Sequence, residues 1–222
     1  SVTGVQTCAL PISVEEDGEG LMSFDISTAT TPIPTSQASH GYSRYSPKNV
    51  ILDGSFAYMS YGSAGIGTID ISNPANIHVP YHYSNKAWYA SEIAVKGNYA
   101  YVCENNYGRL TVLDVTQPRD PVFVSEVEKC MNALLVEGNY LYVLDDHAPA
   151  GTNRSLKVFD ISTPSTPVQV GNVAIGSTPW EMSKSGNYIY VVLASKQIQL
   201  VDVSNPAAPT KIGAAFGANI FR

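Results

Sequence analysis

The chain has 222 residues, of which 44% are hydrophobic and 14% charged, with a formal net charge of −6. Such a composition is too apolar for a disordered chain, and its length suffices for one large all-β domain or two small ones. The basic residues are scattered singly, which argues against a nucleic-acid partner, and no apolar stretch approaches the roughly 20 residues of a transmembrane segment. Fourteen prolines, seventeen glycines and fourteen tyrosines indicate many turns and strands.

In chain order, the first segment is Ser1–Ile12, which differs from everything that follows it. It reads SVTGVQTCALPI and resembles the translation of a sequencing adapter. It has no charged n-region, so we do not expect a secretory signal here. We expect residues 1–12 to be non-native, with Cys8 no biological cysteine and the natural sequence starting near Ser13.

From there on, two short patterns recur along the chain. The segments GSFAYM, GNYAYV, GNYLYV and GNYIYV begin at intervals of 43, 41 and 48 residues, and the pattern Asp-[Ile/Val]-[Ser/Thr] recurs at intervals of 45, 44, 46 and 42 residues. The first pattern starts at Gly54, Gly97, Gly138 and Gly186, and the second at Asp25, Asp70, Asp114, Asp160 and Asp202. A period in the forties with strand-like content is typical of propeller blades and not of helical repeats.

Each repeat predicts four short strands. In the second full unit, apolar or alternating runs at 92–95, 99–103, 109–115 and 122–127 are separated by Gly, Asn and Pro. This is the antiparallel all-β pattern. Runs such as 50–52 and 134–136 are apolar on both faces, so each sheet must be covered on both sides by another. We therefore expect an all-β fold, a β-propeller arc of four-stranded antiparallel blades, with about four full blades plus one partial and an incomplete ring.

The repeated motif resembles that of the LVIVD-repeat β-propeller family. The resemblance is carried by G-N-Y-x-Y-V followed by L-x-[VL]-[FLV]-D-[VI]-[ST]-x-P, as in 97–102 with 110–118, 138–143 with 156–164, and 186–191 with 198–206. It covers residues from about 21 to 213, with a degenerate first full unit. The family resemblance implies a bacterial or archaeal surface or secreted protein, placed in the extracellular space, at the cell surface or in the periplasm.

The repeats also set the expected organisation. We expect a single propeller domain over 13–222, with a partial unit at 13–41 and full units at about 42–87, 88–129, 130–176 and 177–217. Residues 218–222 would start the next unit. Propellers have about four to eight blades, so the chain is expected to be a truncated member of its family.

Residues that recur in every unit are best explained by the fold. The repeated aspartates stand where a strand ends and a turn begins, and their side chains can accept bonds from the turn's own amides. The Tyr pairs, such as Tyr99 with Tyr101, are expected to pack between blades. Cys103 and Cys130 are interpreted as two small buried hydrophobic residues in preference to a disulfide.

Function is expected where the repeat is broken. The distance from the landmark Gly to the following Asp is 16, 17, 22 and 16 residues, so the third full unit carries extra residues in one loop. The loop candidates are Asp145, Asp146, His147, Asn153 and Arg154. The first three could bind a divalent cation, but the spacing of a calcium loop is absent, so neither a metal nor another cofactor is predicted.

A second candidate site precedes the landmark glycines, where the innermost strands would begin at one mouth of a central channel. Its residues are Tyr45, Lys48, Trp88, Glu92, Asn132, Trp180 and Glu181. Aromatic and acidic groups there suit a sugar, a peptide or a cation, while the alternative is an ordinary solvated rim.

The sequence favours a non-catalytic binding or scaffold propeller with a protein or glycan partner, because no nucleophile–base constellation is present. The alternative is a hydrolase or lyase that uses Glu92 or Glu181 as general acid or base. A third interpretation is a fragment without a function of its own, whose ligand site needs further blades. No catalytic residue is predicted.

Overall fold

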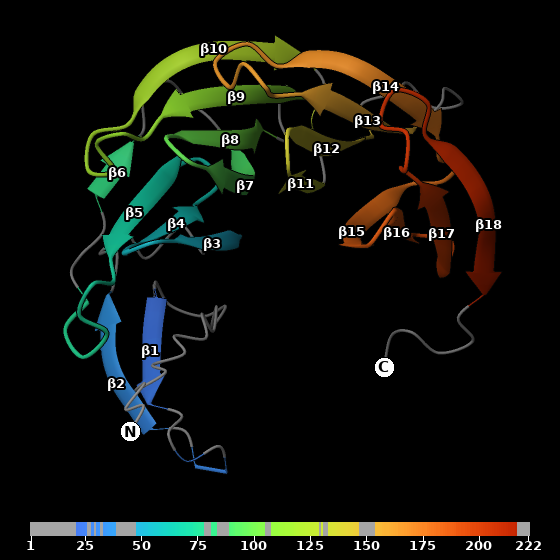
Figure 1. Cartoon of the computed structure of the whole chain (residues 1–222). Helices are drawn as coiled ribbons and strands as arrows, with labels where there is room; N and C mark the ends of the chain where they lie inside the picture. Colours follow the sequence, from blue (N-terminus) through green and yellow to red (C-terminus); the bar gives the residue numbers. More distant parts are fainter. Residues whose placement is uncertain are drawn as a thin grey trace, which may run out of the picture. The chain divides into compact units, whose positions relative to one another are not determined.

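The structure is a computed structural model, and it describes residues 21–25, 28, 30–31, 33–38, 48–77, 81–83, 89–104, 108–128, 130, 133–146 and 154–216. The adapter-like segment 1–12 lies outside these residues. Throughout the described part the chain forms antiparallel β-strands, β1 to β18, and no helix (Figure 1). The strands pair into one two-stranded and four four-stranded sheets. The prediction of about four full blades and one partial is thereby confirmed.

Each sheet is formed by strands that follow one another in the chain, and we name the sheets A to E in chain order. Sheet A pairs β1 (Leu21–Asp25) with β2 (Ile33–Ala38). Sheet B contains β3 (Asn49–Asp53), β4 (Phe56–Ser60), β5 (Ile66–Asp70) and β6 (Tyr81–Tyr83). Sheet C contains β7 (Ala90–Lys96), β8 (Tyr99–Glu104), β9 (Arg109–Asp114) and β10 (Val122–Glu128).

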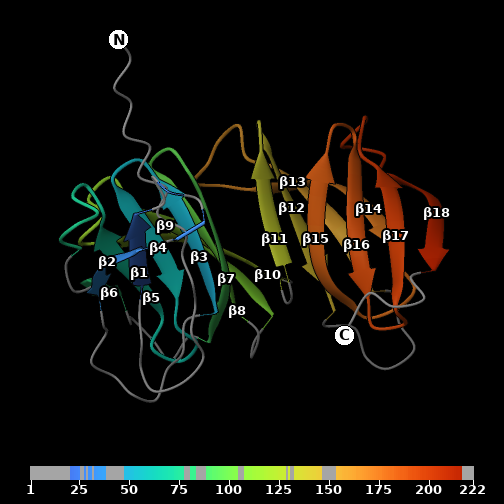
Figure 2. The ribbon, with the colours of Figure 1, turned by 90° about the horizontal axis from the view of Figure 1, so that it is seen from below.

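The remaining two sheets lie side by side in Figure 2. Sheet D contains β11 (Ala133–Glu137), β12 (Tyr140–Asp145), β13 (Ser155–Asp160) and β14 (Val168–Ala174). Sheet E contains β15 (Pro179–Ser185), β16 (Tyr188–Leu193), β17 (Gln197–Asp202) and β18 (Thr210–Phe216).

The repeated glycines form the hairpin between the first and second strands of each full sheet. Gly54, Gly97, Gly138 and Gly186 all have a φ of 55–56°. Each occupies the first position of a two-residue loop, where a type II′ hairpin requires positive φ. The sequence landmark is therefore a turn that only glycine forms without strain.

The repeated aspartates cap the turn between the third and fourth strands. Carboxylate oxygens of Asp70, Asp160 and Asp202 accept bonds from the backbone amides two residues later, at 2.9, 2.7 and 2.8 Å. In each case the residue two positions later is a serine, Ser72, Ser162 or Ser204. Hydrogen bonds from its hydroxyl and its backbone amide hold the pKa of the aspartate carboxyl below the usual value. The predicted structural role of these residues is confirmed.

The chain divides into two compact units. The first unit comprises the described residues up to Ile93 together with Val115–Pro121. Its core lies between sheets A and B, where Leu21 and Ala38 pack against Met59, Ile69 and their neighbours.

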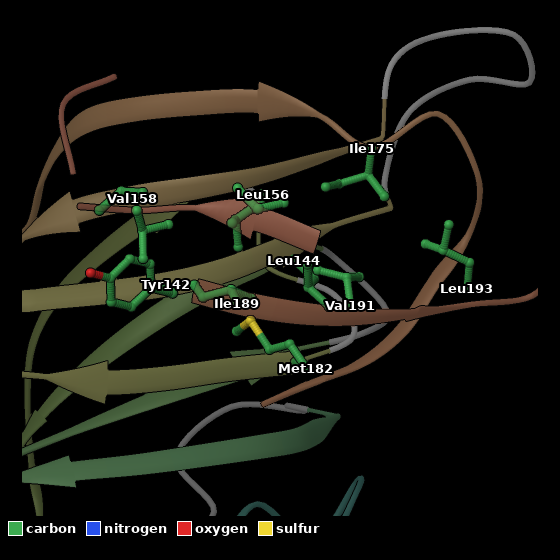
Figure 3. Packing of buried hydrophobic residues seen from close by; sticks show 12 residues of the cluster. Tyr142, Leu144, Leu156, Val158, Ile175, Met182, Ile189, Val191 and Leu193 are labelled. Atoms are coloured by element: carbon green, nitrogen blue, oxygen red, sulfur yellow. The ribbon is translucent and has the colours of Figure 1, made fainter. Parts of the chain in front are cut away.

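The second unit comprises Ala94–Asp114 and the described residues from Val122 onward. One core joins sheets C and D, and it contains Tyr101, Cys103, Leu110, Val112, Cys130, Leu141, Val143, Phe159 and Ile161. A second core joins sheets D and E (Figure 3), where Tyr142, Leu144 and Leu156 lie against Ile189 and Val191. Fully burying an aliphatic side chain of this size stabilises a fold by roughly 1.5–3 kcal/mol, so these cores hold the sheets face to face.

The two cysteines correct the sequence interpretation. Cys103 and Cys130 are completely buried, as expected, but they form a disulfide with their Cα atoms 5.3 Å apart. The amide of Cys130 donates to the carbonyl of Gly108 at 3.1 Å, which returns the chain to the end of β8 where Cys103 lies. The pairing bridges 27 positions of sequence and depends on the path between two sheets, which a local pattern does not reveal.

Candidate functional site

The segments that break the repeat lie at the same ends of the strands in sheets D and E. The carbonyl of Arg154, at the end of the inserted loop, accepts a bond from the amide of Ile175 at 2.7 Å. The carbonyl of Thr178 accepts one from the amide of Ala194 at 2.8 Å. These bonds join the end of the insertion, the entry to β15 and the turn after β16. We call this end of the strands the loop edge. The opposite end of the strands, where the hairpin glycines and the capping aspartates lie, is called the turn edge.

Trp180 is displayed at the loop edge by a β-bulge. Pro179 pairs with Leu193 and Glu181 with Val192, so Trp180 is the extra residue between them. Its side chain is 51% exposed, and the adjacent Glu181 is exposed as well. A bulge redirects a side chain out of the regular alternation of a strand, which accounts for a large aromatic group at the surface.

Two ion pairs connect the residues just before the inserted loop with residues at and just after its end. Lys157 of β13 pairs with Asp145, and both residues are buried. Arg154 pairs with Asp146. Each carboxylate of the proposed loop site is therefore already bound to a protein cation, and no cluster of three or more potential metal ligands occurs among the described residues.

The other two loop candidates, His147 and Asn153, lie outside the described residues. Lys157 was missed by the sequence interpretation. The sequence did contain a signal for it, a single lysine within the otherwise apolar run 156–159. A charge buried in such a strand is stable only beside an opposite charge, so an acidic partner could have been expected.

The predicted channel mouth is described in part. Tyr45, Trp88 and Asn132 lie outside the described residues. Lys48 and Glu92 belong to the first unit, and Trp180 and Glu181 to the second. Within the second unit the structure brings Trp180 and Glu181 together by their adjacency in β15.

In the first unit, Ser60 brings the starts of β3 and β7 together. Its carbonyl accepts a bond from the amide of Lys48, and its hydroxyl donates to the carbonyl of Ser91, both at 2.8 Å. Glu92, the neighbour of Ser91, is half-buried, while Lys48 is exposed. The enzyme alternative needs Glu92 and Glu181 to converge, and it stays a prediction.

Glu104 is a buried carboxyl that the sequence interpretation missed. It is the last residue of β8, it is 1% exposed, and it accepts a bond from the Thr111 hydroxyl at 3.3 Å. Burial raises its pKa above the usual value. Arg109, its partner across the strands, forms an ion pair with Glu126 at 3.1 Å. The available signal was an acidic residue at the end of an otherwise apolar strand.

The successive four-stranded antiparallel sheets, packed face to face within each unit, place the chain among the β-propellers. Solved structures agree. The periplasmic gluconolactonase PpgL of Pseudomonas aeruginosa matches with a TM-score of 0.71 at 12% identity. The match covers 92% of this chain and 65% of the PpgL chain. BamB of Moraxella catarrhalis has a TM-score of 0.60 at 14% identity, covering 90% and 55%.

A protein of Lactobacillus plantarum has a TM-score of 0.72 at 14% identity, covering 95% of this chain and 67% of its own. At such identities the likeness concerns the fold alone, and this chain spans about two thirds or less of each of these proteins.

The family follows from the repeats themselves. The LVIVD repeat matches residues 46–84, 87–129, 132–175 and 179–215, which is more than half of the chain. The chain belongs to the LVIVD repeat family, as its motifs suggested. A comparison with curated protein sequences finds no match.

Proposed function

We propose that this chain is a non-catalytic binding propeller and that the loop edge of sheets D and E contacts its partner. The observation that carries the proposal is Trp180, which a bulge holds half exposed beside an acidic residue. An exposed tryptophan offers a large apolar surface at little entropic cost, and such residues are enriched in binding sites.

A glycan is the partner class that this arrangement favours. The flat face of an indole suits the apolar face of a sugar ring, and the neighbouring carboxylate of Glu181 can accept hydrogen bonds from hydroxyl groups. The ion pairs below the insertion support the same edge, because they fix both ends of the loop on sheet D. A protein partner is the other outcome of the test.

The test is a glycan array probed with the whole chain and with two variants. Trp180→Ala is expected to lose about tenfold or more in affinity, the effect of removing a stacked aromatic anchor. Tyr188→Ala is the matched control, since this tyrosine of the same sheet is 40% exposed at the turn edge. Equal binding by both variants and the parent chain would remove Trp180 from the site, and binding to proteins alone would replace the glycan.

We further propose that the protein works outside the cytoplasm, at the cell surface, in the periplasm or in the extracellular space. The Cys103–Cys130 disulfide supports this placement, because such bonds persist in oxidising compartments and are rare in reducing ones. Fractionation of cells that express this protein, followed by thiol labelling, is expected to find it outside the cytoplasm with the thiols of Cys103 and Cys130 protected.

A further inference from the structure

The Cys103–Cys130 disulfide occupies a corner that the next interface closes without a covalent bond. Cys103 is the sixth residue after the hairpin glycine of sheet C, and Leu144 is the sixth after that of sheet D. Each lies opposite a leucine near the start of the third strand, Leu110 or Leu156, and both are completely buried. Cys103 and Leu144 are therefore equivalent residues of successive sheets.

Cys130 has an equivalent residue as well. Its amide donates to the carbonyl of Gly108 at 3.1 Å, and the amide of Ile175 donates to the carbonyl of Arg154 at 2.7 Å. Gly108 and Arg154 each directly precede the third strand of their sheet. Ile175 is buried and belongs, with Leu144, to the core between sheets D and E (Figure 3).

The same corner is thus built in two ways. Between sheets D and E it contains two aliphatic side chains, and between sheets C and D it contains the disulfide. Burial of aliphatic groups is enough to close such a corner, so the packing of the sheets does not require a covalent bond there. A bond that thiol–disulfide exchange can break gives the corner between sheets C and D two chemical states.

The disulfide lies on the same face of the C–D interface as the buried ion pair of sheet D. Val143 packs in the core that contains both cysteines, and side chains two positions apart on a strand point to the same face, so Asp145 follows Val143 on this face. Phe159 belongs to the same core, which places Lys157 on this face as well. The loop-edge end of the interface therefore contains the disulfide of sheet C and the ion pair before the insertion.

A short stretch of chain connects the two. Cys130 lies three residues before Ala133, the first residue of β11, and Ala133 pairs with Leu144, which directly precedes Asp145. The disulfide links Cys130 covalently to β8, so its reduction removes an anchor from the chain just before β11. A buried ion pair is stable only while its geometry is held and water is excluded, so opening of this corner weakens the pair of Asp145 with Lys157.

We propose that the Cys103–Cys130 disulfide is a redox switch that controls the ion pairs at the base of the inserted loop. In the oxidised form both pairs are closed, and in the reduced form Arg154 separates from Asp146. The switch is a property of sheets C and D and does not depend on Trp180.

The reductant is a dithiol. One of its thiolates attacks a sulfur of the disulfide, and its second thiol resolves the mixed disulfide. The dithiol gives up two electrons and becomes a disulfide, and its two protons end on the thiols of Cys103 and Cys130. Both cysteines are completely buried, so the reaction proceeds through local opening of the chain at this corner.

The test is limited trypsin digestion of the whole chain with and without dithiothreitol, with the products identified by mass spectrometry. Cleavage after Arg154 requires its release from Asp146 and from the start of β13, so its rate is expected to rise about tenfold or more on reduction. Lys196 is the internal control, because it is exposed in the loop-edge turn of sheet E, a sheet without cysteines. Cleavage after Lys196 also corrects for any effect of dithiothreitol on the protease, and relative to it the rate after Arg154 should rise.

Cys103→Val with Cys130→Val is the matched variant, since it places two apolar side chains of similar size in the corner, as sheets D and E have. Its cleavage after Arg154 is expected to be the same with and without dithiothreitol. If this variant fails to fold by circular dichroism, the parent chain decides the question.

Three results would overturn the proposal. The first is a parent chain cleaved after Arg154 at one rate in both redox states. The second is an equal rise after Arg154 and Lys196, because reduction would then unfold the whole chain. The third is a rise in the folded valine variant, because the effect would then not depend on this disulfide.

Discussion

The two edges of sheet D are built by different physics. At the turn edge, Gly138 and Asp160 each satisfy a requirement of their own turn, and the same residues recur in sheet E as Gly186 and Asp202. At the loop edge, the insertion rests on the buried ion pair of Asp145 with Lys157. The residues at the same register positions in sheet C, Glu104 and Thr111, form a hydrogen bond from a hydroxyl group instead. The turn chemistry therefore repeats from sheet to sheet, whereas the side chains that meet at the loop edge differ between sheets, and this variable edge is the place where a specific function can be located.

The largest expected effect comes from breaking the buried pair at the loop edge. Lys157→Met removes the cation that pairs with the buried Asp145 carboxylate, which costs about 3–5 kcal/mol of unfolding free energy. Urea denaturation of the variant measures this loss. The double variant Asp145→Leu with Lys157→Met is the control, and it should recover most of the stability because no charge remains buried. A double variant as unstable as the single one would mean that packing, not charge, holds this edge.

The second expected effect concerns the disulfide beside the same edge of sheet C. Replacing Cys103 and Cys130 by alanine removes a link between residues 27 positions apart and is expected to lower the unfolding free energy by about 3–4 kcal/mol. Denaturation with and without a reductant measures it. The reductant should destabilise the parent chain and leave the variant unchanged, and a parent chain indifferent to reductant would contradict the pairing.

The same division explains what could be predicted from the sequence. The hairpins at Gly54 to Gly186, the aspartate turns and the four-stranded units follow from short patterns, because each is determined by residues a few positions apart. The bulge that exposes Trp180 and the partner of Lys157 were not predictable in this way. Register shifts and buried pairs depend on what the neighbouring strand and sheet present, which no local pattern contains.

The candidate site shows both outcomes. The sequence indicated Trp180 and Glu181 because they precede a landmark glycine, where the innermost strand of a blade begins, and both are exposed at the loop edge. Glu104 was overlooked, because an acidic residue at a strand end ordinarily reaches solvent, and its burial is known only from the packing around it.

The smallest expected effect is a difference in the sign of pH dependence between the two edges. Burial raises the pKa of Glu104 in the folded state, so its stability contribution is complete below the unfolded pKa near 4.3 and is lost as the pH rises through the folded value. Asp160 at the turn edge has a lowered pKa, caused by the amide and hydroxyl of Ser162, so its contribution is present above about pH 3.9 and is lost on acidification.

Glu104→Gln is therefore expected to raise the melting temperature at pH 7 and to match the parent near pH 3. Asp160→Asn should lower the melting temperature at pH 7 and match the parent in acid. Melting curves of both variants from pH 3 to 7 measure the two slopes, and a Glu104→Gln variant less stable than the parent at pH 7 would show that the carboxylate is paired and not merely buried.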